Sequence, residues 1–132
     1  MTLVDTSAWV EFLRDTGSAA CTEVDRLLGS EEDLSITEPV LMEVLAGARD
    51  DTHLRDLRGL VGRANIRRCL PEDYETAALL YRTCRQQGET VRRLIDCLIA
   101  AVALRAGTAV LHHDEDFEVL ARHSSLRIHR PR

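Results

Sequence analysis

The chain has 132 residues, 45% of them apolar, so one domain of this length can bury a sizeable hydrophobic core. Its longest apolar run, Cys97 to Leu104, is far shorter than the roughly 20 residues that a membrane-spanning helix needs. Met1 is followed directly by a strand-like segment, which argues against a secretory signal peptide. We therefore expect a single cytoplasmic domain over residues 1–132, with no membrane attachment.

The net charge of −5 conceals an unusual set of basic residues, because all 17 are arginine and the chain contains no lysine. A biased genome composition would explain this without any function. Arginine is also the side chain that binds phosphate through two parallel hydrogen bonds, and it occurs in pairs at Arg67-Arg68 and Arg92-Arg93. An acidic protein can bind nucleic acid if its acids surround a metal ion while arginines line the approach. The net charge therefore neither establishes nor excludes nucleic-acid binding.

The first half of the chain alternates strand-like and helix-like segments. Apolar spacing predicts strands at residues 2–4 and 34–36, and helices at 8–13, 19–28 and 40–48. Thr37 can cap the third of these helices, and Pro39 lies in its first turn, where a missing N–H costs nothing.

The second half continues the alternation. Helices are expected at 54–64, 71–87, 91–106 and 116–122, and strands at 65–70, 108–111 and 126–129. Pro71 is a typical first helical residue, while Gly88 and Gly107 are typical stops. Strands that alternate with helices throughout predict an α/β fold, a three-layer α/β/α sandwich around a mostly parallel sheet of about five strands.

Two of the predicted strands end directly in carboxylates. Asp5 follows the first strand, and Asp114 and Asp116 follow the strand at 108–111. The carboxyl ends of parallel strands border the crevice where ligands bind in open α/β sheets, so these acids are candidate site residues. Each could instead only cap the helix that follows it.

Two further acids lie on predicted helices. Asp96 interrupts the most apolar helix of the chain, where a lone buried carboxylate is costly unless it is paired or binds a metal. An ion pair with Arg92 or Arg93, one turn earlier, is the alternative. Glu43 lies off the core stripe of its helix, and the residues one turn further on are small, which leaves room for a ligand to approach.

The four acidic loci, which hold five acids because Asp114 and Asp116 share one locus, are more informative together than singly. Grouped carboxylates repel one another unless a cation lies among them, and oxygen-only ligands suit Mg²⁺ or Mn²⁺ rather than zinc. The sequence therefore predicts a metal site at the carboxyl edge of the sheet.

These residues resemble a known family, the PIN-domain ribonucleases, and within it the VapC toxins of prokaryotic toxin–antitoxin pairs. The matching segments cover the chain from end to end, in the family's order: Val4-Asp5-Thr6-Ser7-Ala8-Trp9, Met42-Glu43-Val44-Leu45-Ala46-Gly47, Arg93 to Ala103, and His112 to Phe117. One departure is His112, since many members carry Thr or Ser two residues before Asp114. This departure leaves open how Asp114 and Asp116 share the last acidic role.

The resemblance implies a catalytic ring of five acids. Asp5 and Asp96 would be the principal Mg²⁺ ligands, joined by Asp114, and Glu43 and Asp116 would complete the ring.

The resemblance also implies roles outside the ring. Ser7 or Thr6 would orient Asp5, and Arg92 and Arg93 would bind the substrate. The implied activity is metal-dependent cleavage of RNA, often a structured RNA such as transfer RNA. The implied partners are a VapB-like antitoxin and a second copy of the chain, in a homodimer and a toxin–antitoxin hetero-oligomer.

Other interpretations fit the residues less well. A phosphate-receiver domain needs a lysine opposite its aspartates, and a dehalogenase-type phosphatase needs an acid where this chain has Ser7. A PIN-like module that binds RNA or protein without cutting is a further alternative, although such a module has no use for a repulsive cluster of carboxylates. A housekeeping RNA-processing nuclease would carry the same residues as a toxin.

Overall fold

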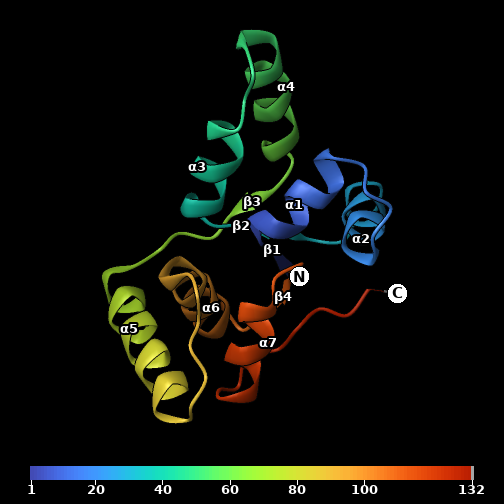
Figure 1. The fold of residues 1–132 in the computed structure, drawn as a ribbon. Coiled ribbons are helices and arrows are strands. Elements are labelled where there is room, and N and C mark those ends of the chain that lie inside the picture. The colour runs from blue at the N-terminus through green and yellow to red at the C-terminus, as the bar shows by residue number, and fades with distance from the viewer. Residues whose placement is uncertain (132) are drawn as a thin grey trace.

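The computed structural model describes residues 1–131 and shows a short sheet surrounded by helices (Figure 1). Its elements in chain order are β1 (Thr2–Val4), α1 (Thr6–Leu13), α2 (Ala19–Leu28), β2 (Leu34–Ile36), α3 (Glu38–Ala46), α4 (Asp51–Val61), β3 (Asn65–Ile66), α5 (Pro71–Gln86), α6 (Leu94–Ala106), β4 (Ala109–Leu111) and α7 (Glu115–Arg122). The predicted alternation of strands and helices is confirmed.

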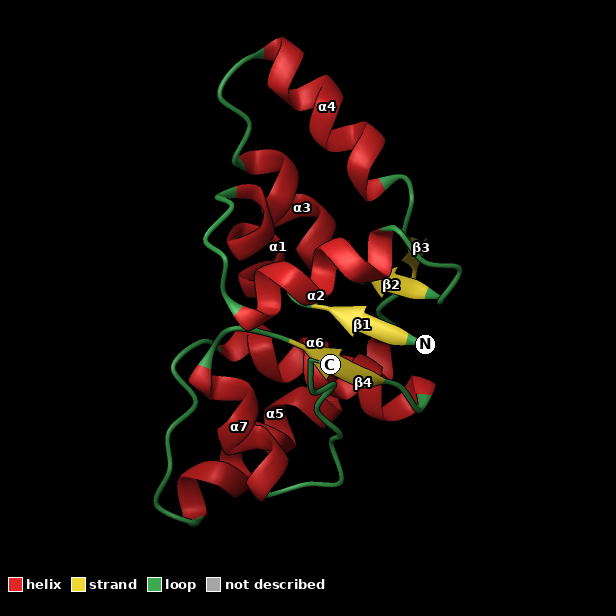
Figure 2. Cartoon of the chain, turned by 90° about the vertical axis from the view of Figure 1, so that its right-hand side faces the viewer, coloured by secondary structure: helices red, strands yellow, loops and turns green. Residues whose placement is uncertain are grey.

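The sheet has four parallel strands in the order β3-β2-β1-β4, which lie side by side in Figure 2. β1 is an interior strand, and its Leu3 lies opposite Ser35 of β2 and Val110 of β4. The chain runs outward from β1 through β2 to β3 and then returns to the other side of β1. The carboxyl ends of β1 and β4 therefore flank the point where strand order reverses, which is where ligands bind in such sheets.

Helices cover both faces of the sheet. α1 and α2 pack against each other on one face, and α5 and α6 on the other (Figure 1). Strand side chains on both faces are buried, and Leu3, Val4, Ile36, Val110 and Leu111 are each at most 1% exposed. This arrangement confirms the three-layer sandwich. No helix within residues 1–131 is long and apolar enough to cross a membrane.

The expectation of a fifth strand at 126–129 is wrong. This segment forms one isolated parallel bridge, between Val110 and Ile128. The chain then leaves the sheet edge, because the His129 ring bonds to Glu23 and Arg130 pairs with Glu118. The sheet therefore has four strands.

Several other boundaries differ from the prediction by a few residues; α4, for example, spans Asp51–Val61 rather than 54–64. Two of these differences have a clear physical cause. β3 ends at Ile66 rather than at residue 70, because the Cys69 N–H donates to the Glu38 carboxylate at 2.7 Å instead of continuing the strand ladder. α6 begins at Leu94 rather than just after Thr90. The backbone before Leu94 is held by a carboxylate from α7 and cannot enter the helix, as described below.

Candidate active site

Asp5 lies at the carboxyl end of β1 and is 2% exposed. Its Oδ2 accepts hydrogen bonds from the Ser7 backbone N–H at 2.9 Å and the Ser7 hydroxyl at 2.6 Å. Asp5 thus caps α1, and it also faces the reversal point of the sheet. Burial raises its pKa despite the bonds from Ser7, and the charge of Glu43 adds to the rise.

The two hydroxyls after Asp5 orient different acids. Ser7 holds Asp5, and its Oγ also accepts the backbone N–H of His113 at 2.9 Å, which ties the end of β1 to the loop after β4. The Thr6 hydroxyl donates to Glu43 Oε1 at 2.9 Å. Of the two candidates, Ser7 therefore orients Asp5 through its side chain, whereas the side chain of Thr6 fixes Glu43.

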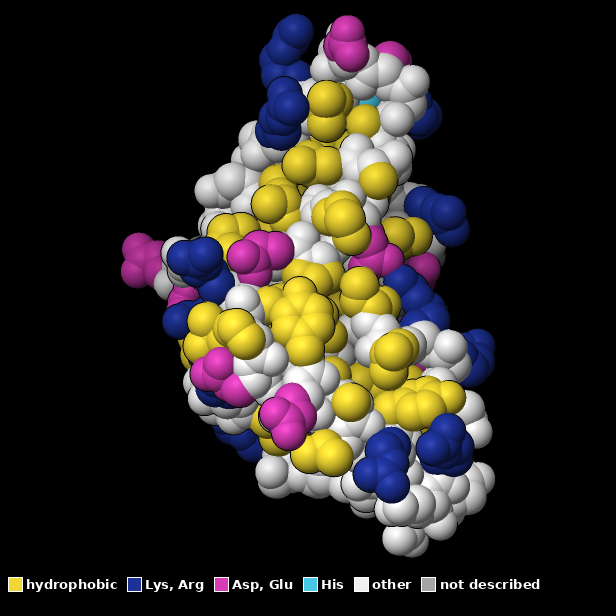
Figure 3. All heavy atoms as spheres, turned by 90° about the vertical axis from the view of Figure 1, so that its left-hand side faces the viewer, with side chains coloured by type: hydrophobic (Ala, Val, Ile, Leu, Met, Phe, Trp, Pro, Cys, Tyr) yellow, Lys and Arg dark blue, Asp and Glu magenta, His cyan; other side chains and the backbone are white. Residues whose placement is uncertain are grey.

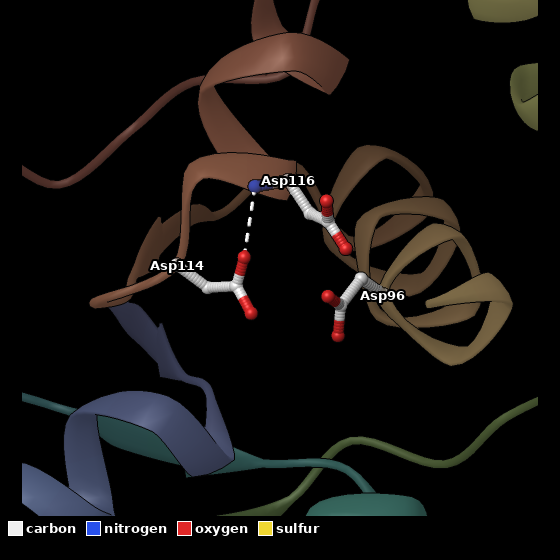
Figure 4. Close-up of side chains that lie close together, drawn as sticks. All are labelled: Asp96, Asp114 and Asp116. Atoms are coloured by element: carbon white, nitrogen blue, oxygen red, sulfur yellow. Dashed lines mark hydrogen bonds between the residues drawn. The ribbon is translucent and has the colours of Figure 1, made fainter. Parts of the chain in front are cut away.

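Three aspartates converge beside this edge, and we call them the acidic triad. Asp96 comes from α6, Asp114 caps α7 and Asp116 lies in the first turn of α7 (Figure 4). One carboxylate oxygen from each lies within 4.8 Å of the others. Asp96 and Asp116 are buried and Asp114 is partly open to solvent, so the triad has one open side.

Asp96 is the least satisfied member of the triad. Its Oδ2 is buried and has no hydrogen-bond partner among residues 1–131. Burial raises the pKa of Asp96 to about 8, and the charge of Asp5 contributes next. A buried polar atom without a partner is costly, so this oxygen indicates a missing ligand.

The alternative of an ion pair between Asp96 and a neighbouring arginine is wrong. Arg92 pairs with Asp114 at 2.9 Å and with Asp116 at 3.4 Å, and Arg93 pairs with Glu43 at 2.5 Å. Both guanidiniums therefore lie at the rim of the acidic residues, and within the described part of the chain Asp96 forms no ion pair.

Asp116 and Asp114 have different structural duties. The two carboxylate oxygens of Asp116 accept the backbone N–H groups of Arg92 and Arg93, each at 3.0 Å. Burial alone would raise the pKa of Asp116, but these bonds and its contact with Asp96 lower it overall. Asp114 Oδ1 accepts the Asp116 N–H at 2.9 Å, while across residues 1–131 its Oδ2 accepts no hydrogen bond. Asp114 therefore has an oxygen available for a ligand.

Sequence reasoning missed the role of His112. Its Nδ1 accepts the Asp114 backbone N–H at 3.0 Å, and its Nε2 lies 2.7 Å from Glu118 Oε2. The ring also packs on Phe117, with centroids 5.2 Å apart. His112 therefore fixes the backbone that carries Asp114. The only available signal was its position two residues before that acid.

The residues of this edge fit a divalent cation. The donors are all carboxylate oxygens, which hard cations such as Mg²⁺ and Mn²⁺ prefer. One of them, Asp96 Oδ2, lacks a protein partner in the part of the chain that the structure describes. Asp5 is linked through Ser7 to His113, the residue before Asp114, so it borders the same site although it is outside the triad.

Comparison with known families agrees with this geometry. Residues 2–123 match the family model of the PIN domain. We call Asp5, Glu43 and the acidic triad together the acidic edge. The fold and this acidic edge define a PIN-domain protein.

Curated relatives narrow the class. A VapC ribonuclease of Mycobacterium bovis and ribonuclease VapC11 of Mycobacterium tuberculosis are each 47% identical to this chain over 129 residues, which is 96% of this chain and 96% of the relative. The chain belongs to the VapC ribonucleases, metal-dependent endoribonucleases that form the toxin component of type II toxin–antitoxin systems.

Solved structures share the fold at low sequence identity. VapBC2 from Rickettsia felis, bound to a fragment of its promoter DNA, superposes with a TM-score of 0.76 at 16% identity, covering 97% of this chain and 96% of that chain. VapC20 from Mycobacterium tuberculosis, described as a sarcin-ricin loop cleaving toxin, gives a TM-score of 0.68 at 20% identity, covering 96% and 99%.

Proposed function

We propose that the acidic edge is a Mg²⁺ site, with Mn²⁺ as a possible substitute, and that it hydrolyses RNA. Asp5, Asp96 and Asp114 are the proposed metal ligands, and Glu43 and Asp116 complete the catalytic ring. The observation that carries this proposal is the buried, unpartnered Asp96 Oδ2 within a converging set of carboxylates. If Asp96 had only a structural role, its buried oxygen would be expected to accept a hydrogen bond from the protein.

The chain's own residues divide the work. When bound, the cation would lower the pKa of a water molecule and offset charge on the phosphorane. Ser7 keeps Asp5 oriented and Asp116 keeps the start of α6 in place. Arg92 and Arg93 lie at the rim, where a phosphate could exchange for the carboxylates that they now contact. A carboxylate of the ring accepts the proton of the attacking water.

The proposed substrate is a structured RNA, such as a transfer RNA, cut in the cytoplasm. A single-stranded loop is the part of such an RNA that can splay its backbone into an acidic crevice. The description of VapC20 as a sarcin-ricin loop cleaving toxin supports a loop substrate by analogy.

The proposed partners are a VapB-like antitoxin and a second copy of the chain. Related folds have been solved as VapBC complexes, which supports the first. For the second copy, α3, α5 and α6 present a surface that we call the apolar face (Figure 3). Met42, Tyr74 and Leu94 on it are 61%, 59% and 59% exposed. Apolar side chains gathered in this way are typical of interaction sites.

Cleavage with and without metal tests the proposal. Purified protein should cut a transfer RNA in Mg²⁺ or Mn²⁺ and stop when EDTA is added, and the Asp96→Asn variant should not cut under either condition. Equal cleavage in excess EDTA would refute the mechanism. Binding without any cleavage, in every metal tried, would instead favour a non-cleaving PIN-like module.

A further inference from the structure

A pocket beside the acidic edge has no role in the mechanism above. It encloses about 340 Å³ between α1, α3 and α4. Glu43 belongs both to this pocket and to the catalytic ring. Its carboxylate contacts Thr6 and Arg93, which lie beside the ring. The pocket is therefore the immediate extension of the proposed active site toward α4.

The walls of the pocket combine an apolar floor with basic side chains. Val44 and Leu57, 4% and 2% exposed, form part of the floor. Arg14, at the end of α1, and Arg49, in the loop before α4, line the rim. The Arg49 backbone N–H donates to His53 Nδ1 at 3.0 Å, so the imidazole is fixed against the same rim.

These two arginines differ from those at the acidic ring. Arg92 and Arg93 each form ion pairs, whereas the guanidiniums of Arg14 and Arg49 form no hydrogen bond or ion pair with the residues that the structure describes. An unpaired guanidinium keeps its full capacity for a bidentate bond to phosphate. The pocket therefore combines two arginines that can bind an anion with the buried apolar side chains of Val44 and Leu57, and Arg14 also lies near the charge of Glu11.

We infer that this pocket binds the nucleotide next to the cleaved phosphodiester, with its base on the apolar floor and its phosphate between Arg14 and Arg49. The inference rests on the proposed ribonuclease function. Glu43 borders both the catalytic ring and this pocket, so a strand held at the ring that extends past Glu43 enters the pocket. Its volume is at the lower end of small-ligand sites, which suits one nucleotide rather than a helical segment.

Binding measurements on the full chain test the inference. Arg14→Gln and Arg49→Gln remove one charge each, and Arg82→Gln on α5 is the matched control, because Arg82 is equally exposed and unpaired within residues 1–131 but lies outside the pocket. Fluorescence anisotropy with a labelled single-stranded RNA, in EDTA so that no cleavage occurs, should show several-fold weaker binding for both pocket variants. The slope of log K against log salt should fall by about 0.7 for each, as for one lost phosphate contact on a single strand.

Several outcomes overturn the inference. The first is a salt slope and Kd unchanged in both pocket variants while their melting temperatures match wild type. The second is an Arg82→Gln variant that weakens binding as much as they do. The third is a pair of pocket variants that bind RNA normally but lose affinity for an antitoxin peptide, which would assign the pocket to that partner.

Cleavage is scored separately on the wild type in Mg²⁺. A wild type that cuts RNA while the pocket variants bind it normally refutes the pocket and leaves the nuclease standing. A wild type that never cuts, together with pocket variants that lose RNA affinity, refutes the nuclease and supports the pocket.

Discussion

Asp96 is buried among other carboxylates, and burial raises its pKa to about 8, so the metal-free fold disfavours the charged form of this side chain. We expect Asp96→Asn to be at least as stable as wild type in EDTA, because the change keeps the shape of the side chain and replaces the carboxyl with a group that is neutral at every pH. The same variant should lose most of the rise in melting temperature that Mg²⁺ or Mn²⁺ produces in wild type, since that rise comes from binding to the native state. Thermal melts in EDTA and in each metal measure both effects.

Asp116→Asn is the control for this prediction. Both oxygens of Asp116 accept backbone N–H groups, and an amide can replace only one of these acceptors. This variant should lose about 1–3 kcal/mol of stability with or without metal. The Asp96 prediction fails if Asp96→Asn behaves in the same way, with a large loss in EDTA that metal does not alter.

His112 offers a second prediction at the level of a single side chain. His112→Asn can keep an acceptor near the position of Nδ1, whereas His112→Gln can keep a donor toward Glu118 and loses the acceptor for the Asp114 N–H. If His112 positions Asp114, the Gln variant should bind Mn²⁺ about tenfold more weakly than the Asn variant, measured by calorimetry. Both variants lose the ring contact with Phe117 alike, so equal affinities would show that only packing matters.

The acids of the site could be predicted from the sequence, but the residues that hydrogen-bond to them and orient them could not. Asp5 and Asp114 directly follow strands, and Asp96 interrupts an apolar helix, so each shows a local conflict or a local geometry. The bonds from the Thr6 hydroxyl to Glu43 and from the His113 N–H to Ser7 depend on which distant segments meet in space. The alternative of an ion pair between Asp96 and a neighbouring arginine was wrong, because other acids in the fold bind those guanidiniums.

At the level of elements, α2 is tied to the end of the chain through Glu23. This side chain is 2% exposed, pairs with Arg26 at 2.7 Å and contacts the His129 ring at 2.5 Å. His129 in turn bonds to the Thr2 hydroxyl of β1 at 2.8 Å. Bonding to Arg26 lowers the pKa of Glu23 to about 2 in spite of burial, with His129 contributing less.

This depressed pKa makes the fold sensitive to acid. A carboxyl group whose pKa is lower in the folded state stabilises the fold above its unfolded pKa, and that stabilisation is lost as pH falls through the folded value. Glu23→Gln should therefore cost on the order of 3 kcal/mol at pH 7, and the difference from wild type should shrink between about pH 4.5 and pH 2. Denaturant unfolding across this range measures it. Glu31→Gln, on an exposed side chain after α2, is the control for removing one charge near this end of the helix.

The sequence predicted which segments are helices and which are strands, but it predicted their first and last residues less well. Apolar spacing and the residues Pro71 and Gly107 identified the helices, because these signals are local. The start of α6 depends on Asp116, more than twenty residues away, so no local signal near Thr90 could show it. The segment at 126–129 has the composition of a strand, but it pairs with the sheet only at one bridge. The His129 ring then bonds to Glu23 and Arg130 pairs with Glu118, so the chain leaves the sheet.

For the whole molecule, the apolar face predicts the oligomeric state. Tyr74→Glu places a charge in the middle of that face and should convert a homodimer into a monomer, measured by light scattering during gel filtration. Leu13→Glu is the control, because Leu13 is 40% exposed but lies on α1, which is not one of the three helices that form this surface. Two variants with the same mass as wild type would place the dimer contact elsewhere.

The hydrogen bonds that Asp116 accepts from the Arg92 and Arg93 amides also couple the start of α6 to the position of α7. The N–H groups that precede a helix are normally left to solvent and exchange their protons quickly. Here they are covered by a carboxylate 24 and 23 residues further along the chain, so they become exposed only when α7 moves away from α6. We expect these two amides to exchange deuterium at the rate of α7 opening. Their protection would then report whether the helices that carry Asp96 and Asp116 are closed together, with no RNA or metal present.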